Sequence, residues 1–285
     1  MKKNIIALFF FILFFSLDLS AQNYKTPYQD TDEFGIFALG DMGTGWSNEY
    51  KLFSLIAKYP IKDYSAILLL GDISYPDGNP KLIESNITKP YKPVFEAGFK
   101  FYPAIGNHEF LFEKAKYIKE YFNVPYYYNF KIGSAEFWSL DVNSGGARFD
   151  KEQAEWLKDS LVKSSAIWKI VFFHESPYSS GIVHGNNNYL IKNLVPILET
   201  NKVDLCLTAH NHLYERTEEI NGVLYITSGG GSASLHKYDK AIGFNSAFVK
   251  SIYHFLKIKG NAKELKIEAI NLENEVFDSI ILNKD

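Results

Sequence analysis

Short apolar runs recur along the chain, and glycines or polar residues bound them. They are rich in Ile, Val, Leu and Phe, which is typical of strands in a largely buried sheet. The first six lie at residues 34–39, 66–70, 101–105, 136–140, 169–173 and 203–207. Four more lie at residues 223–227, 252–258, 265–270 and 276–282, with short connections and no good helix between them. The late runs therefore predict a second sheet packed on the first.

Amphipathic segments lie between the early apolar runs. The clearest is Asp150–Lys163, where Asp150 and Gln153 resemble a capping box and apolar residues recur at helical spacing. Residues 48–58 and 188–199 have a similar pattern. The alternation of strands and helices predicts the α/β class (α+β in some schemes), with helices flanking two packed sheets.

The amino-terminal segment has the pattern of a secretory signal. Lys2 and Lys3 precede an apolar run at residues 5–15, which is too short to span a bilayer. Ser20-Ala21-Gln22 is a suitable cleavage site. We therefore expect residues 1–21 to be removed and the mature protein to be secreted or periplasmic, without a transmembrane segment. An uncleaved membrane anchor is the alternative.

Composition narrows the class of protein. The chain has 285 residues and a formal net charge of −3, so it has no general attraction to nucleic acid. Cys206 is the only cysteine, which excludes an intramolecular disulfide, and its apolar neighbours predict a buried core residue. No repeat, low-complexity tract or linker divides the chain, so residues 22–285 are predicted to form a single catalytic domain.

Polar motifs come directly after the apolar runs, at the positions where strands should end. They contain two Asp, one Tyr, one Asn and three His that are candidate metal ligands: Asp41, Asp72, Tyr75, Asn107, His174, His210 and His212. In open α/β sheets, ligands collect at the carboxyl ends of the strands, so we expect these side chains to form one site. The number of donors is sufficient for two adjacent metal ions.

Two of these residues carry particular information. The carboxylate of Asp72 has two oxygens and can bridge two ions. The phenol of Tyr75, three positions later, has an ordinary pKa near 10 and is a poor ligand for most divalent ions. A hard trivalent ion such as Fe(III) stabilises a phenolate strongly, so Tyr75 indicates iron in one position.

The ordered set resembles the calcineurin-like metallophosphoesterase superfamily and, more narrowly, the purple acid phosphatases, including the tartrate-resistant type. That family's pattern is Asp-x-Gly, Gly-Asp-x-x-Tyr, Gly-Asn-His-Glu/Asp, Val-x-x-His and Gly-His-x-His. The wider superfamily has His at the position of Gly43, whereas this chain supplies Tyr75, as the purple enzymes do. Ala209 departs from the family's Gly, which we expect to shift that loop slightly. The resemblance implies two packed mixed sheets flanked by helices.

By this resemblance, three side chains hold Fe(III) and three hold a divalent Fe, Zn or Mn ion, with one carboxylate between them. The first three are Asp41, Tyr75 and His212; the second three are Asn107, His174 and His210; Asp72 is the bridge. The resemblance also makes His108 the residue that stabilises or protonates the leaving oxygen. His184, in a polar loop ten residues past His174, is a candidate substrate contact.

The implied function is a secreted acid phosphatase in which a metal-bound hydroxide attacks the phosphorus of a small phosphate monoester and releases inorganic phosphate. Two alternatives stay open: a phosphodiesterase or nucleotide hydrolase on the same scaffold, and a non-catalytic protein that binds metal and phosphate. No Gly-x-Ser-x-Gly motif favours a serine hydrolase. We expect His236 and His254 to be non-catalytic, residues 229–232 to form a tight turn near the site, and Asn86 to match a glycosylation triplet.

Overall fold

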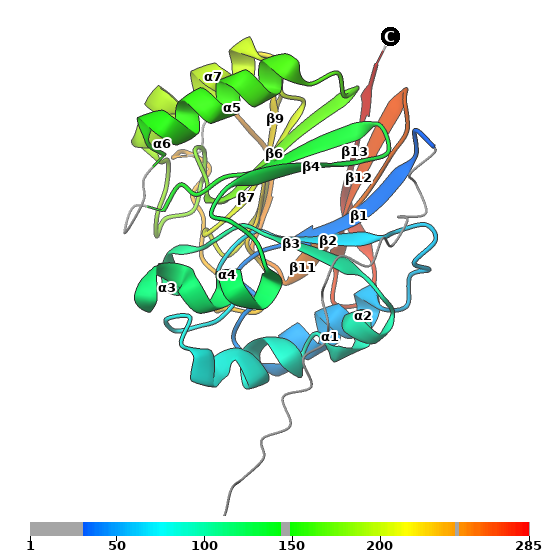
Figure 1. The fold of residues 1–285 in the computed structure, drawn as a ribbon, viewed down its shortest axis with the longest axis vertical. Helices are drawn as coiled ribbons and strands as arrows, with labels where there is room; N and C mark the ends of the chain where they lie inside the picture. Colours follow the sequence, from blue (N-terminus) through cyan, green and yellow to red (C-terminus); the bar gives the residue numbers. More distant parts are fainter. Residues whose placement is uncertain (1–30, 144–148, 243–244, 285) are drawn as a thin grey trace, which may run out of the picture.

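Two mixed β-sheets pack face to face in a computed structural model that describes residues 31–143, 149–242 and 245–284 (Figure 1). The first sheet has six strands in the order β13-β12-β11-β1-β2-β3. Their bounds in that order are Val276–Asn283, Glu264–Asn271, His254–Gly260, Phe34–Leu39, Ala66–Leu69 and Lys100–Pro103. Strands β1, β2 and β3 are parallel, whereas β11, β12 and β13 run antiparallel to their neighbours. This sheet therefore presents three carboxyl ends at one edge.

The second sheet has seven strands in the order β10-β8-β9-β7-β6-β5-β4. Their bounds in that order are Ser246–Lys250, Tyr214–Thr217, Leu224–Ser228, Leu205–Ala209, Trp168–Glu175, Ala135–Ser139 and Tyr128–Ile132. Strands β5, β6, β7 and β9 are parallel. The pairs β4/β5, β8/β9 and β10/β8 are antiparallel, so both sheets are mixed, as the resemblance implies.

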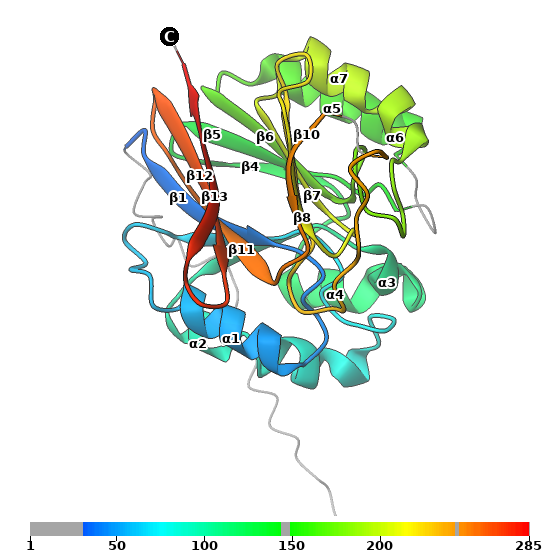
Figure 2. The same ribbon diagram turned by 180° about the vertical axis from the view of Figure 1, so that it is seen from behind.

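Helices cover the outer faces of the two sheets (Figures 1 and 2). On the first sheet they are α1 (Ser47–Ile56), α2 (Lys92–Glu96), α3 (Asn107–Phe110) and α4 (Lys116–Phe122), with short turns at Pro80–Leu82, Glu84–Thr88 and Glu113–Ala115. On the second sheet they are α5 (Lys151–Lys163), α6 (Asn188–Asn193) and α7 (Val195–Thr200). The layers are therefore helix, sheet, sheet and helix.

Alternation along the strands divides the core into three clusters, because successive side chains point to opposite faces of a sheet. Phe34 and Ile36 on β1 pack between the sheets against residues such as Phe172, whereas Phe37 and Leu39 pack against α1. On the second sheet, alternate residues pack against α5, α6 and α7, and the buried Cys206 belongs to this cluster, as predicted. Each fully buried large apolar side chain contributes about 1.5–3 kcal/mol of transfer free energy.

All ten predicted strands are present within about three residues at each end, but their grouping differs from the expectation. The late strands do not form a separate sheet: β11 pairs with β1 and extends the first sheet, whereas β9 pairs with β7 in the second. Strands β4, β8 and β10 were not predicted. The grouping was not predictable because local periodicity carries no information on which strands pair. Strand β4 was missed because it alternates exposed and half-buried side chains over most of its length and has no apolar run.

The clearest predicted helix, α5, begins as expected. The Asp150 side chain caps it by accepting a hydrogen bond from the Gln153 N–H (2.8 Å). Gln153 does not close the box; its amide instead bonds the backbone N–H and carbonyl of Asp141, just past β5. The predicted helix at residues 188–199 is two helices, since Pro196 near the start of α7 lacks the N–H that a continuous helix requires.

None of the helices within the described ranges has the length and apolar character needed to cross a bilayer. The predicted signal peptide, residues 1–21, lies outside the described residues.

Candidate metal centre

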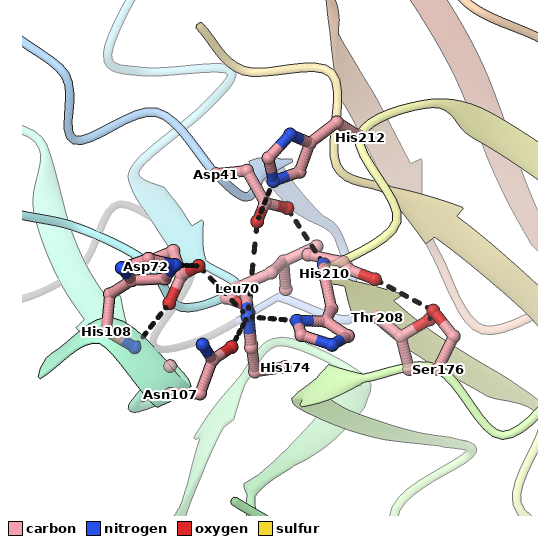
Figure 3. Close-up of polar contacts among 12 residues, drawn as sticks. Asp41, Leu70, Asp72, Asn107, His108, His174, Ser176, Thr208, His210 and His212 are labelled. Carbon is pink, nitrogen blue, oxygen red and sulfur yellow. Dashed lines mark hydrogen bonds and ion pairs between the residues drawn. The ribbon is translucent and has the colours of Figure 1, made fainter. Parts of the chain in front are cut away.

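The predicted ligands converge where the carboxyl ends of parallel strands from both sheets meet (Figure 3). Asp41, Asp72 and Asn107 follow β1, β2 and β3 of the first sheet. His210 follows β7 of the second sheet, and His174 lies inside β6 rather than after it. The site therefore bridges the two sheets instead of lying at the edge of one.

Three of these residues have left-handed backbone conformations, although none is a glycine. Their φ angles are 58° at Asp41, 53° at Asp72 and 68° at His210. Such conformations are uncommon for non-glycine residues and persist where surrounding contacts fix them. Here the His210 N–H donates to Asp41 Oδ2 (2.8 Å), so two of the strained turns hold each other. The left-handed conformation at these positions accompanies the convergence of the Asp41, Asp72 and His210 side chains on one site.

One set of donor atoms surrounds the Tyr75 hydroxyl. This oxygen lies 3.0 Å from Asp41 Oδ1, 2.9 Å from Asp72 Oδ2 and 3.2 Å from His212 Nε2. His212 Nε2 is also 3.2 Å from Asp41 Oδ1. Four side chains thus bring one donor atom each to a single point.

A second set of donor atoms surrounds His174 Nε2. This nitrogen lies 3.1 Å from Asn107 Oδ1, 3.2 Å from His210 Nδ1 and 3.3 Å from Asp72 Oδ2. The same oxygen, Asp72 Oδ2, therefore belongs to both sets. Hereafter the seven residues of the two sets are called the ligand cluster: Asp41, Asp72, Tyr75, Asn107, His174, His210 and His212.

The spacing and protonation of the ligand cluster fit metal ions. Two ligands at ~2.1 Å from one ion and ~90–109° apart are separated by ~3.0–3.4 Å, which matches the distances above. His174 and His212 use Nδ1 to donate to the carbonyls of Leu70 (2.9 Å) and Ser234 (2.8 Å). Nε2 is then the nitrogen of each ring that faces the other donor atoms, which is the position from which it would bind a cation.

Charge in the ligand cluster also favours a cation. Burial alone would lower the pKa of His174, but Asp72 and Asp41 raise it to about 10. Burial, Asp41 and Asp72 raise the pKa of the Tyr75 phenol well above its ordinary range. Tyr75 is therefore a neutral donor until a strong positive charge is placed beside it. Asp72, His174 and His210 meet the geometric requirements of a metal site by themselves.

Glu109 folds the backbone around Asp72. Its buried carboxylate accepts four hydrogen bonds of 2.8–3.0 Å, from the N–H groups of Asp72, Ile73, Ser74 and Gly106. Burial first, and Asp72 second, raise the pKa of Glu109 to about 7. The sequence placed Glu109 in a motif but gave it no role, and the structure assigns it the support of the bridging carboxylate.

Asn86 is a supporting residue whose role sequence analysis did not predict. Its side chain is buried, and Nδ2 donates to the carbonyls of Gly43 (2.9 Å) and Tyr75 (2.7 Å). The asparagine of the glycosylation triplet thus holds the backbone of a candidate ligand, and its nitrogen is occupied in the folded protein.

His108 lies beside the ligand cluster. Its Nδ1 donates to the Pro76 carbonyl, and its Nε2 is 3.8 Å from Asp72 Oδ2. The ring lies 4.4 Å from that of Tyr75, and 32% of the side chain is exposed. One nitrogen of the imidazole is anchored, and the other lies close to the bridging carboxylate.

The structure brings two further histidines against members of the cluster. The ring of His184 lies 3.8 Å from that of His210, so this predicted residue is close to the site. The ring of His236 stacks on that of His212 at 4.0 Å and 16°, a contact that sequence analysis did not predict. His254 is different, because it is buried in β11 with Nε2 bonded to Ser228 Oγ.

The motif glycines and Ala209 are explained by close packing. Ala209 lies in the regular strand β7, so its methyl causes no strain; the strained residue is His210. A side chain at Gly40 would lie 2.2 Å from the Ala209 Cβ, and one at Gly229 would lie 2.7 Å from Asp41 Oδ2. The predicted glycine-rich turn is therefore beside the site, where only glycine leaves room.

Comparison with known proteins identifies the same family. The calcineurin-like phosphoesterase family matches residues 34–214. Purple acid phosphatase 18 of Arabidopsis thaliana is 27% identical over 220 residues, which cover 67% of this chain and 48% of that protein. The chain spans about half or less of the length of several curated relatives that it matches.

Two solved structures show the same fold. A purple acid phosphatase from yellow lupin (Lupinus luteus) has a TM-score of 0.77 and 19% identity, covering 90% of this chain and 54% of that one. GAP50 of Plasmodium, described as an anchor in the inner membrane complex, has a TM-score of 0.71 and 20% identity, covering 89% of each chain. The predicted resemblance to purple acid phosphatases is confirmed, and the paired donor sets are those of a dinuclear metal centre. The chain belongs to the calcineurin-like phosphoesterase family.

Proposed function

We propose that this protein is an acid phosphatase that hydrolyses small phosphate monoesters and releases inorganic phosphate. The observation that carries the proposal is the position of Asp72 Oδ2, which lies 2.9 Å from Tyr75 Oη and 3.3 Å from His174 Nε2. One carboxylate oxygen shared by two donor sets is the arrangement that a pair of adjacent ions requires.

The proposed ligands divide between the two sets. Asp41, Tyr75 and His212 bind one ion; Asn107, His174 and His210 bind the other; Asp72 is shared. The only phenol in the cluster belongs to the first set, which supports Fe(III) there and a divalent Fe, Zn or Mn ion in the second set. Two such ions, when bound, acidify water and offset the negative charge of the phosphoryl oxygens.

His108 is proposed to protonate the departing alcohol oxygen. Its Nδ1 proton is committed to the Pro76 carbonyl, so Nε2 carries a proton only when the ring is an imidazolium. His184 is proposed to contact the phosphate group from the His210 side.

The same proposal includes export and a single domain. The basic start, the apolar run at residues 5–15 and the cleavage site before Gln22 support a signal peptide and a secreted or periplasmic location. Residues 22–285 are proposed to form one catalytic domain.

The first experiment is a visible absorption spectrum of the purified protein, together with metal analysis. We expect two metals per chain, one of them iron, and a broad mid-visible band from the Tyr75 phenolate bound to Fe(III). Tyr75→Phe should abolish the band, whereas Tyr50→Phe, at an exposed tyrosine, should retain it. A colourless protein with two Zn or Mn ions would reject iron but retain hydrolysis, and a protein that binds no metal would reject the proposal.

Turnover of p-nitrophenyl phosphate should exceed that of bis(p-nitrophenyl) phosphate in the same preparation. The reverse order would favour the phosphodiesterase alternative. Two bound metals without turnover of either ester would favour the binding protein.

A further inference from the structure

Two loops beside the ligand cluster are joined to each other. The His184 loop (residues 180–187) follows β6, and the His236 loop (residues 232–239) follows β9. Their backbone links are Ile182 N–H to Lys237 O (3.1 Å), Asp239 N–H to Ser180 O (2.9 Å) and a bridge between Gly181 and Tyr238. The two loops therefore form one unit, and the spacing of their histidines is set by this ladder.

Buried Glu215 fixes that unit to the second sheet. Its carboxylate accepts hydrogen bonds from both the N–H (2.7 Å) and the hydroxyl of Ser180, where the His184 loop begins. Glu215 lies on β8, three residues past His212. The position of the loops relative to the ligand cluster is thus determined by the strand next to it.

His236 packs directly on a residue of the ligand cluster. The rings of His236 and His212 are nearly parallel at 4.0 Å, and the His236 N–H donates to the His212 carbonyl (2.9 Å). The His184 ring lies 5.4 Å from that of His236 and 3.8 Å from that of His210. Two imidazoles outside the cluster therefore lie next to each other, each against one of its histidines.

The hydrogen bonding of His236 fixes its tautomer. The His212 backbone N–H donates to His236 Nδ1 (3.1 Å). A backbone N–H can only donate, so Nδ1 is unprotonated and the ring proton is on Nε2. Within the described part of the chain no group accepts that proton, and the side chain is half-buried rather than enclosed. His236 therefore offers one directed donor whose other nitrogen is already anchored.

We propose that His236 is a second phosphate-binding residue, which donates from Nε2 to a phosphoryl oxygen while His184, on the adjoining loop, contacts the same group. The inference rests on the proposed phosphatase function and deepens it, because it assigns a substrate contact that the family motifs do not contain. A phosphate group has several acceptor oxygens, so it can accept from two neighbouring imidazoles at once, here the anchored His236 and the adjacent His184. Phosphate affinity would then depend on the loop unit as well as on the metals.

Two isosteric variants separate this role from mere support of His212. In His236→Asn, the amide oxygen replaces Nδ1 and still accepts from the His212 N–H, but the distal donor is lost. In His236→Gln, the amide nitrogen replaces Nε2 and the proximal acceptor is lost. Binding of inorganic phosphate to each metal-loaded protein is measured by calorimetry, with metal content and kcat and KM for p-nitrophenyl phosphate measured alongside.

We expect His236→Asn to weaken phosphate binding about tenfold and to raise KM, with both metals retained, because one hydrogen bond to a charged group is lost. His236→Gln should bind phosphate within about threefold of wild type. Unchanged affinity in His236→Asn, or loss of a metal together with the affinity, would overturn the proposal, as would a wild-type protein that binds no phosphate. If His236→Asn binds phosphate more weakly than wild type as expected, but the wild type turns over no ester, the phosphate site would stand and the phosphatase function would be rejected instead.

Discussion

The ligand cluster and the histidines around it are built in different ways. Asp41, Asp72 and His174 are almost completely buried, lie in or directly after parallel strands, and are held by backbone hydrogen bonds or by one another. His184 and His236 lie on loops, are partly exposed, and are positioned through ring stacking and the ladder between the loops. Strand ends thus fix the positions of the candidate metal ligands, and loops carry the groups that we propose meet the substrate.

This difference separates the two kinds of failure that mutation should cause. A change in the ligand cluster should remove metal and activity together, because its donors share one oxygen. A change in the surrounding histidines should leave the metals in place and alter affinity or the proton transfer. Metal content is therefore the measurement that distinguishes the two regions.

Asp72→Ala should have the largest effect, because it removes the oxygen common to both donor sets. We expect at least one metal to be lost and kcat to fall by about 10³ or more. Metal analysis and turnover of p-nitrophenyl phosphate measure both. Asp159→Ala, at an exposed aspartate on α5, is the control and should retain both. Two metals and near-normal turnover in Asp72→Ala would remove the distinction between the regions.

His108→Ala should lower kcat by at least about tenfold while both metals remain bound. The metals should remain because His108 is not a member of the ligand cluster. Its Nδ1 is hydrogen-bonded to the Pro76 carbonyl, and its Nε2 lies 3.8 Å from Asp72 Oδ2. The loss should be larger for a phosphate ester of an alkyl alcohol than for p-nitrophenyl phosphate, since p-nitrophenolate leaves without a proton. An equal loss for both esters would argue that His108 acts only through charge.

The cluster was predictable from the sequence because each of its residues belongs to a short polar motif that follows an apolar run, and strand ends meet in α/β folds. The sequence did not predict that β1 and β6 belong to different sheets, because pairing such as β1 with β11 is not local. His236 lies in an irregular loop with no periodicity, so its contact with His212 exists only in three dimensions. Asn86 matched a surface motif, and its burial depends on the distant Gly43 and Tyr75 carbonyls.

Glu109→Gln tests the support of the cluster rather than its donors. The amide nitrogen of Gln would face backbone N–H groups that now donate to a carboxylate oxygen, and at least one of the four hydrogen bonds would be lost. We expect unfolding to be easier by about 1–3 kcal/mol and metal affinity to fall about tenfold. Thermal unfolding of the metal-free protein and a metal titration measure the two effects separately. Unchanged metal affinity would show that Asp72 holds its position without Glu109.

Asp141→Asn should have the smallest effect, and it compares a buried carboxyl outside the cluster with those inside it. Burial raises the pKa of Asp141 from 3.8 to about 7, and its Oδ2 has no hydrogen-bond partner within the described ranges. The folded state therefore binds this proton more tightly than the unfolded state does. The resulting stability is present below about pH 4 and is lost as the pH rises toward 7.

Asn carries no such charge but keeps the oxygen that accepts from Asn143. The measured quantity is the Tm of Asp141→Asn minus the Tm of wild type. This difference should be a few degrees larger at pH 8 than at pH 4, which corresponds to roughly 1–3 kcal/mol. All other titrating groups are common to both proteins, so the difference between them isolates Asp141. A difference that does not change with pH would mean that Asp141 is ionised at low cost. The buried carboxylates of the cluster would then need no cation to explain their presence.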